Sequence, residues 1–324
     1  GVAAGRITDY TVQKRSIDAR SRQVKIILQV TAFIDEQVVK EAAFDPELRD
    51  VSGAGHVVIV GAGPAGLFAA LKLISLGIKP IVIERGKDVR SRRRDLAAMN
   101  KEGIVNPESN YCFGEGGAGT YSDGKLYTRS TKRGNVQRIL QLFHHFGASP
   151  DILYEAHPHI GTNKLPHIIT AIREQITACG GTVLFDTRLT DIVLNGDQIK
   201  AVTTSDGGTI TCKAVILATG HSARDVFRLL HHKGIAVESK PFALGVRIEH
   251  PQLLIDQAQY RCGIRDPYLP PASYSLVVQE NGRGVFSFCM CPGGIIAPAA
   301  TAPGEIVVNG WSPSKRNNPY ANSG

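Results

Sequence analysis

Residues 57–67 read VVIVGAGPAGL, and an alanine- and leucine-rich segment separates them from a second apolar run, IVIER, at 81–85. An apolar run without alternation is typical of a parallel strand that is covered on both faces. Gly61, Gly63 and Gly66 follow the first run with the G-x-G-x-x-G spacing of a dinucleotide-binding turn. The stretch therefore predicts a strand, a glycine turn, a helix and a second parallel strand, in an α/β fold.

Each glycine of this turn has its own physical role. The first permits the tight turn, the second lets the backbone approach a pyrophosphate, and the third lets the helix pack closely on the sheet. The phosphates then meet the positive end of the helix dipole, next to Pro64 and Ala65. We therefore predict nucleotide binding at this turn, the alternative being a turn used only for packing.

The acidic residue at the end of the second strand refines this prediction. Glu84 lies about 20 residues beyond the glycines, where an acidic side chain accepts a hydrogen bond from a ribose hydroxyl. Arg85 could instead pair with a 2′-phosphate, as in NADP enzymes, but the acid before it would repel that group. The pair therefore favours the adenosine ribose of FAD or NAD.

A second glycine-rich segment, at 110–126, contains five glycines between Gly114 and Gly124. Such a loop can lie flat against a ligand and turn its N–H groups towards a pyrophosphate or the polar edge of a flavin. A flexible surface loop is the alternative. The cofactor-binding candidates in this loop are Gly116, Gly117, Ala118, Gly119 and Thr120.

Further cofactor-binding candidates lie along the rest of the chain. An apolar strand ends in Ala218-Thr219-Gly220, where small residues allow passage beside a cofactor, and Leu189 is a further candidate.

Helical spacing predicts helices over 136–146 and 165–176. Alternation over 182–185, 191–194 and 199–204 predicts a β-meander.

Composition and charge restrict the function classes. The chain has 324 residues, 43% hydrophobic content and a net charge of +8, which is sufficient for two packed domains. The charge raises the possibility of a nucleic-acid partner. Part of the positive charge is concentrated in one segment, however, at Arg90, Arg92, Arg93 and Arg94. Of these, Arg93 is our candidate for contact with an anionic cofactor, and a solvated helix face is the alternative. No compact nucleic-acid motif is present, so such a partner is not expected.

The apolar run at 57–83 is interrupted by glycines and lysines, so a βαβ unit explains it better than a membrane span does. Charged residues precede the first apolar stretch, so no secretory signal is expected. The six cysteines lack a zinc-like double C-x-x-C pattern, and no metal site is predicted. We therefore expect a cytoplasmic protein.

The C-terminal region offers candidates for chemistry. Arg247, Glu249 and His250 could form a polar catalytic site, because a carboxylate can fix the histidine tautomer, although a structural network is the alternative. Cys289 and Cys291 lie on one face of a predicted strand before a Pro-Gly-Gly bend. A disulfide between them would close a strained ring. Cys291 is therefore our candidate for a reactive thiol beside a flavin, and buried inert thiols are the alternative.

These motifs together resemble the flavoproteins with two dinucleotide-binding domains that are related to glutathione reductase. More narrowly, the sequence resembles a bacterial group described as uncharacterised FAD-dependent or NAD(FAD)-utilising dehydrogenases. The narrower resemblance rests on the segments 14–20, 113–120, 157–162, 245–250 and 289–294. It implies FAD as the cofactor and a small-molecule substrate. Such flavoproteins usually carry a second glycine-rich Gly-Asp motif near the C-terminus, which is not found up to Gly324.

We therefore predict an α/β protein with a Rossmann-like FAD-binding domain over 53–234, in which a helical segment is inserted at about 131–180. A small α+β module precedes it over 1–52, and a β-rich substrate or cap domain, expected to be incomplete at its C-terminal end, follows over 235–324. The predicted function is that of an FAD-dependent oxidoreductase with NADH or NADPH as a transient donor. The alternatives are a flavin-dependent RNA-modifying enzyme and a non-catalytic FAD-binding protein.

Overall fold

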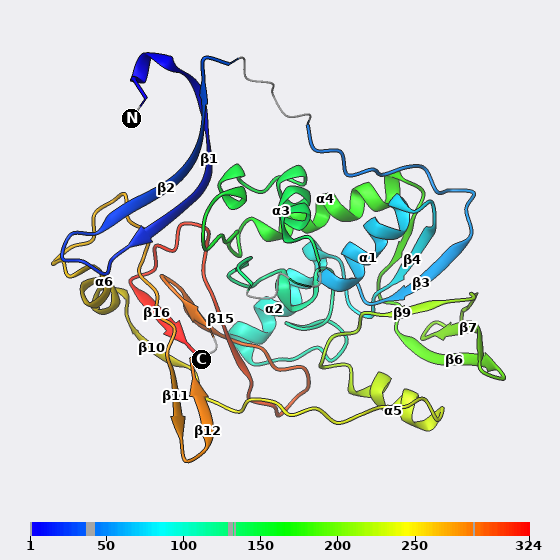
Figure 1. Cartoon of the computed structure of the whole chain (residues 1–324). Helices are drawn as coiled ribbons and strands as arrows, with labels where there is room; N and C mark the ends of the chain where they lie inside the picture. Colours follow the sequence, from blue (N-terminus) through cyan, green and yellow to red (C-terminus); the bar gives the residue numbers. More distant parts are fainter. Residues whose placement is uncertain (1, 37–42, 129–131, 133, 288) are drawn as a thin grey trace.

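The computed structural model describes residues 2–36, 43–128, 132, 134–287 and 289–324. A four-stranded parallel sheet with the order β5-β4-β3-β9, here called the central sheet, lies on the right in Figure 1. Its strands are β3 (His56–Val60), β4 (Lys79–Ile83), β5 (Thr182–Leu184) and β9 (Val215–Leu217). Helix α1 (Pro64–Ser75) connects β3 to β4, which pair in parallel. The predicted strand–turn–helix–strand unit is therefore confirmed.

Both faces of this sheet are covered, which explains the unbroken apolar character of β3. Ile59 packs into a core with α1 and α4 (Leu165–Ala178). Its neighbours Val58 and Val60 point to the opposite face, because side chains alternate along a strand. There they pack against the antiparallel strands β6 (Leu189–Asn195) and β7 (Gln198–Thr204). Val58, Ile59 and Val60 are thus buried whichever way they point.

The predicted β-meander is correct in two strands and wrong in the third. Residues 182–184 form β5, which pairs in parallel with β4 at the edge of the central sheet. The third strand of the meander is instead β8 (Thr209–Thr211), which pairs with β7. Alternation alone identifies a strand but not its partner, so it could not place 182–185.

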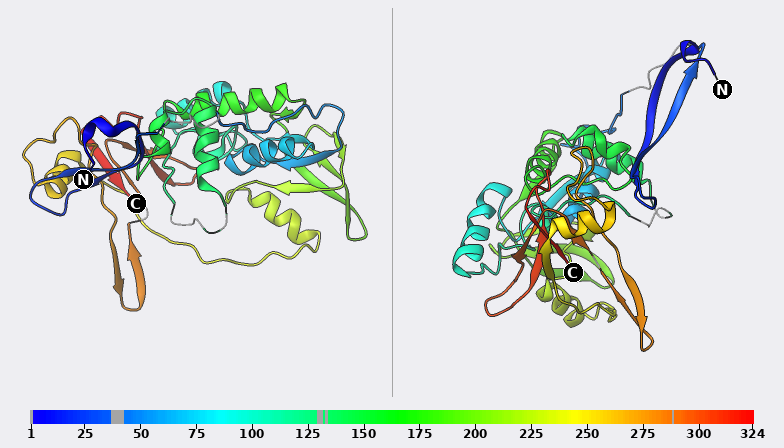
Figure 2. Two further views of the ribbon diagram at one scale, coloured as in Figure 1. Left: turned by 45° about the horizontal axis from the view of Figure 1, so that its top comes forward. Right: turned by 90° about the vertical axis from the view of Figure 1, so that its left-hand side faces the viewer.

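The N-terminal segment differs from the expected α+β module. Strands β1 (Ile7–Asp18) and β2 (Lys25–Ile34) form a long antiparallel ribbon that stands away from the rest of the molecule (Figure 2). Within residues 2–36 and 43–52, the one helical element is the 3₁₀ turn η1 (Ala4–Arg6). The ribbon contacts the body through Arg15, whose backbone pairs with Tyr154 and Ala156 and whose guanidinium lies 2.9 Å from Glu155.

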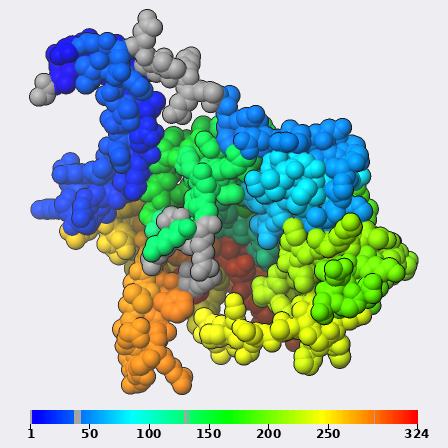
Figure 3. All heavy atoms as spheres, turned by 45° about the vertical axis from the view of Figure 1, so that its right-hand side comes forward, coloured from blue at the N-terminus to red at the C-terminus, as the bar shows by residue number. Residues whose placement is uncertain are grey.

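The region after the central sheet is rich in antiparallel strands. A three-stranded sheet has the order β10-β16-β13, and β14 pairs with β15. Strands β11 and β12 form a second ribbon that projects from the body in the space-filling view (Figure 3). The bounds are β10 (Ile248–Pro251), α6 (Gln252–Tyr260), β11 (Val277–Glu280), β12 (Arg283–Phe286), β13 (Met290–Cys291), β14 (Ile295–Pro298), β15 (Val308–Trp311) and β16 (Tyr320–Ser323).

Five further helical elements lie in the described part of the chain. They are α2 (Val89–Glu102), η2 (Gly117–Gly119), α3 (Val136–His145), η3 (Pro150–Leu153) and α5 (Arg224–His232). The helices predicted over 136–146 and 165–176 are confirmed as α3 and α4. None of the helices in the described ranges combines the length and apolar character that crossing a membrane requires.

Candidate functional site

The glycine turn between β3 and α1 is built so that only its middle glycine faces open space. Gly61 has a positive φ of 107°, and a β-carbon there would overlap the Ala218 carbonyl. A β-carbon at Gly66 would overlap the Gly61 carbonyl. At Gly63, by contrast, the nearest atom to a β-carbon would be the Gly117 Cα, 3.9 Å away. The first and third glycines therefore serve packing, and the second leaves room for a ligand.

The N-terminus of helix α1 faces the open space beside Gly63. Gly63 is the N-cap, Pro64 occupies the first turn, and no side chain caps the terminus. Proline lacks an N–H group, so it removes one donor that would otherwise need a partner. Such a terminus carries partial positive charge and unpaired N–H groups, which suits an anionic group.

Glu84 links the glycine turn to the second glycine-rich loop. Its side chain is buried, and its Oε1 accepts hydrogen bonds from the backbone N–H groups of Gly86 and Gly114, both at 2.9 Å. Its Oε2 accepts one from Ala62 at 2.8 Å. Glu84 therefore shapes the site in addition to lining it, which the sequence pattern alone did not predict.

The glycine-rich loop is held by Arg92, which is fully buried on α2. Its five hydrogen bonds, 2.7 to 3.3 Å long, reach four backbone carbonyls and one hydroxyl of the loop: Asn110, Tyr111, Glu115, Gly117 and Thr120. A guanidinium has five N–H donors in a fixed fork, so this side chain is saturated. The loop backbone is thus fixed from inside the protein, and its other side is left to the cavity.

Arg85 is already paired. Its Nε lies 2.9 Å from Glu108 and its Nη1 lies 3.0 Å from Asp225. Its guanidinium also stacks 4.3 Å above the Phe113 ring. Arg188 approaches the same two carboxylates at 3.5 and 3.6 Å. The charge of Arg85 is therefore balanced by the protein, which reduces its capacity to bind a 2′-phosphate.

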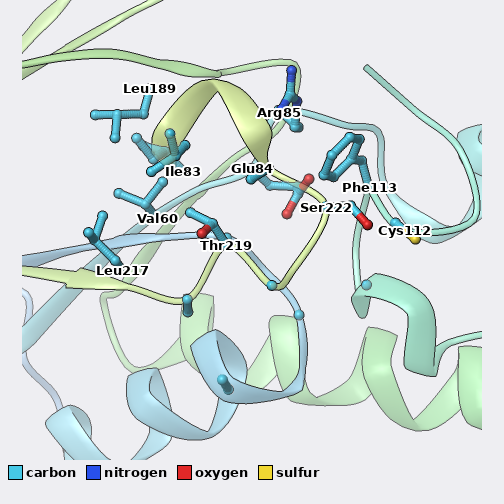
Figure 4. A pocket seen from close by; sticks show the side chains of 18 of the residues that line it. Val60, Ile83, Glu84, Arg85, Cys112, Phe113, Leu189, Leu217, Thr219 and Ser222 are labelled. Carbon is cyan, nitrogen blue, oxygen red and sulfur yellow. The ribbon is translucent and has the colours of Figure 1, made fainter. Parts of the chain in front are cut away.

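These elements enclose a cavity of about 480 Å³ (Figure 4). In the close-up, labelled side chains approach it from the strand ends, from the segment after β9 and from the glycine-rich loop. Predicted cofactor-binding residues among those that line it are Gly61, Gly63, Pro64, Ala65, Glu84, Arg85, Gly117, Ala118, Gly119, Leu189, Ala218, Thr219 and Gly220. Its size is within the range of small-molecule sites.

Four predicted cofactor-binding residues are not part of the lining. Gly66 packs against Gly61, as described above, and the N–H of Gly116 donates to the Ala62 carbonyl at 2.8 Å. Thr120 is buried against Arg92. Arg93 is exposed on α2, one position away from the buried Arg92. The helix phase thus turns Arg92 into the loop and leaves Arg93 exposed, with its charge beside Tyr121.

Several lining residues were not singled out from the sequence. Cys112, Thr187, Arg188, His221 and Ser222 all line the cavity. Each of them adjoins a predicted position or lies within the glycine-rich segment. Extending each motif by two residues along the chain would have found them.

The catalytic candidates lie apart from this lining and do not form a single group. The Arg247 guanidinium donates to the side-chain amide oxygen of Asn322, Oδ1, at 2.7 Å, close to Cys291. His250 instead lies 3.0 Å from the Tyr274 hydroxyl, and Glu249 is exposed. The structure therefore does not bring Arg247, Glu249 and His250 together as a triad.

Residues of the glycine-rich loop do meet the C-terminal region at a buried ion pair. Asp123 lies 2.6 Å from the Nη2 of Arg316, accepts a hydrogen bond from Ser312 and is 3.5 Å from Lys125. Burial by itself would raise the pKa of this carboxyl, but the charges of Arg316 and Lys125 and the hydrogen bonds from Arg316 and Ser312 together outweigh it and hold the pKa below its usual range. Asp123 therefore connects the loop to the segment after β15.

Replacing Asp123 with alanine should lower the free energy of unfolding by about 3–5 kcal/mol at pH 7, because Arg316 is left buried without its partner. The pKa is lower in the folded state, so this contribution is present above the unfolded pKa and is lost as the pH falls through the folded one. Urea unfolding of both proteins should show the difference shrinking in acid. Asp197→Ala, at an exposed turn, is the control, with a change within about 0.5 kcal/mol. A difference that grows in acid would contradict the assignment.

The sequence comparisons match the site to known families. The FAD binding domain family matches residues 55–225. A family described as FAD-dependent protein, C-terminal domain-like, matches 241–324, and a domain of unknown function matches 1–33. The first of these matches runs from β3 to the start of α5 and includes every residue that lines the cavity except Val226.

Individual proteins are also similar to this chain. An uncharacterized protein of Clostridium beijerinckii is 41% identical over 335 residues, and the match covers 98% of this chain and 62% of that protein's length. A thiamine thiazole synthase of Aeropyrum pernix is 25% identical, over 65% of this chain and 72% of that protein. Among solved structures, THI4 of Thermovibrio ammonificans is 22% identical with a TM-score of 0.39, covering 56% of this chain and 64% of that one.

Proposed function

Because the chain belongs to the FAD binding domain family, which matches residues 55–225, we propose that the cavity binds the adenosine and pyrophosphate half of FAD. The observation that carries this proposal is the uncapped start of α1 beside the open space at Gly63. A pyrophosphate would fill that space and accept from the free N–H groups of the first turn. The size and lining of the cavity fit such a group.

The environment of Glu84 supports placing the ribose at the end of β4. An ionised carboxylate has about four lone-pair sites. Backbone N–H groups use two on Oε1 and one on Oε2. The remaining site on Oε2 is available to a ribose hydroxyl at the cavity wall. The pairing of Arg85 with Glu108 and Asp225 supports a ribose without a 2′-phosphate.

We further propose that the protein is an FAD-dependent oxidoreductase that acts on a small molecule. The bound flavin supplies hydride and electron transfer, and the protein supplies position and electrostatics. In this chain the glycine turn and the loop that Arg92 holds would position the cofactor. We also propose a glutathione-reductase-like arrangement, in which NADH or NADPH is the transient electron donor.

The absorption spectrum of the purified chain tests this proposal. After incubation with FAD and gel filtration, we expect flavin bands at one flavin per chain, and bleaching of those bands when NADH or NADPH is added anaerobically. A protein that is folded but carries no flavin would overturn the binding proposal. If the flavin binds but neither NADH nor NADPH reduces it, the binding proposal stands and the proposal of a nicotinamide donor is wrong.

A further inference from the structure

Two cysteines outside the cofactor cavity share one lysine. Cys289 and Cys291 are separated by a single residue at β13, and both approach the Lys125 ammonium, at 3.0 and 3.7 Å from Nζ to the two sulfur atoms. Cys291 is buried on the strand pair with β16, and Cys289 is partly exposed. The lysine comes from the end of the glycine-rich segment, which pairs with His159 through an isolated bridge.

The charges around this pair favour a thiolate at Cys289. Lys125 and Arg247 are the cations that face it, and Asp123, the nearby acid, is itself paired with Arg316. The Cys291 thiol donates a hydrogen bond to Cys289, and this bond together with the Lys125 charge outweighs burial and lowers the pKa of Cys289. The same contact raises the pKa of Cys291. The geometry therefore favours Cys289, the more exposed sulfur and the one closer to Lys125, over Cys291, the candidate chosen from the sequence.

The other cysteines lack this environment. Cys179 and Cys212 are buried, and burial raises the pKa of Cys212. Cys112 and Cys262 are partly exposed, but no hydrogen bond to a lysine or arginine reaches either sulfur within the described part of the chain. Low-pKa, accessible thiols beside a second thiol are the ones that oxidants modify selectively.

We propose that Cys289 is an oxidation site for hydroperoxides and that Cys291 is its resolving thiol. The Cys289 thiolate attacks one oxygen of hydrogen peroxide, so that an S–O bond forms and the O–O bond breaks. The sulfur loses two electrons to the peroxide, and the leaving hydroxide becomes water by taking a proton from the Lys125 ammonium. Cys291 then attacks the sulfenic sulfur, an S–S bond forms, and the hydroxyl leaves as water with the Cys291 proton.

The spacing of the two cysteines makes the oxidised form labile. A disulfide across one intervening residue closes a small, strained ring. Strained disulfides have higher reduction potentials and are the reversible, regulatory ones. The site therefore serves as a reversible thiol switch, and it does not depend on a flavin in the cavity.

Mass spectrometry after mild hydrogen peroxide treatment tests this proposal. In the flavin-free chain we expect a disulfide between Cys289 and Cys291 that a dithiol reductant removes. Cys291→Ser should stop at the sulfenic acid, which dimedone traps on Cys289. Cys289→Ser should leave Cys291 unmodified. Equal oxidation of Cys112 and Cys262, or a dimedone label on Cys291 in the Cys289→Ser protein, would overturn the proposal.

A lysine variant tests the cause of the reactivity. Lys125→Met should slow the reaction of Cys289 with peroxide at pH 6 by about tenfold or more, because the thiolate loses its cation. Lys101→Met, at an exposed position on α2, is the matched control, and its Cys289 should react at the wild-type rate.

In the wild-type chain, iodoacetamide at pH 6 should alkylate Cys289 about tenfold faster than Cys262. Equal alkylation of the two would overturn the proposal even if Lys125→Met fails to fold.

Discussion

Replacing Arg92 with methionine should lower the free energy of unfolding by about 3–5 kcal/mol, since four backbone carbonyls of the glycine-rich loop lose their donor. Methionine fills a similar volume, so the effect comes from the lost hydrogen bonds rather than from a cavity. The loop also forms one wall of the cofactor cavity, so the affinity for FAD should fall in the same variant. Urea unfolding and FAD titration measure the two effects.

Two further variants define this prediction. Arg94→Met changes an exposed arginine on the same helix and should alter stability by no more than about 0.5 kcal/mol. Arg92→Lys keeps the charge but cannot reproduce the five-donor fork, so its stability should lie between those of the wild type and Arg92→Met. If Arg92→Met were as stable as Arg94→Met, the loop would not depend on this guanidinium.

Gly63→Val should abolish cofactor binding while leaving the fold in place. The branched side chain would occupy the open space beside α1, so we expect FAD affinity to fall by about 100-fold or more, which is about 3 kcal/mol. Its folding cost should be only about 1 kcal/mol, the price of a poorer N-cap. Isothermal titration with FAD and thermal unfolding separate the two quantities.

Gly66→Ala, unlike Gly63→Val, should mainly affect stability. Its β-carbon would overlap the Gly61 carbonyl, a backbone atom that cannot move freely. We expect it to destabilise the protein by about 3 kcal/mol, which is the upper end of typical overpacking costs. If Gly63→Val retained stoichiometric flavin, the pyrophosphate would not lie at this turn, whatever Gly66→Ala did.

Much of the central fold could be predicted because its signals are local. The residues 57–85 contain two strands, a turn and a helix in sequence order, and the turn requires glycine at fixed positions. The same pattern located six of the residues that line the cavity, since a ligand site at the end of a parallel strand is built in part by residues that follow it directly. Helices α3 and α4 were found from their apolar spacing for the same reason.

The parts that were not predicted depend on contacts between distant segments. Which arginine of α2 faces inward depends on where the helix begins, so Arg93 was chosen and Arg92 was found buried. We place the thiolate on Cys289 because Lys125, more than a hundred residues earlier, approaches that sulfur more closely. Strand 182–184 pairs with β4 through a crossover that alternation does not reveal.

Competition among fragments of the cofactor tests the central claim, that the cavity holds the adenosine and pyrophosphate half of FAD. FAD binding to the wild-type chain should be displaced by ADP, which carries that half, and should not be displaced by FMN, which carries only the flavin and one phosphate. The same titration with Gly63→Val should show no binding of FAD or ADP. Displacement by FMN but not by ADP would contradict the account.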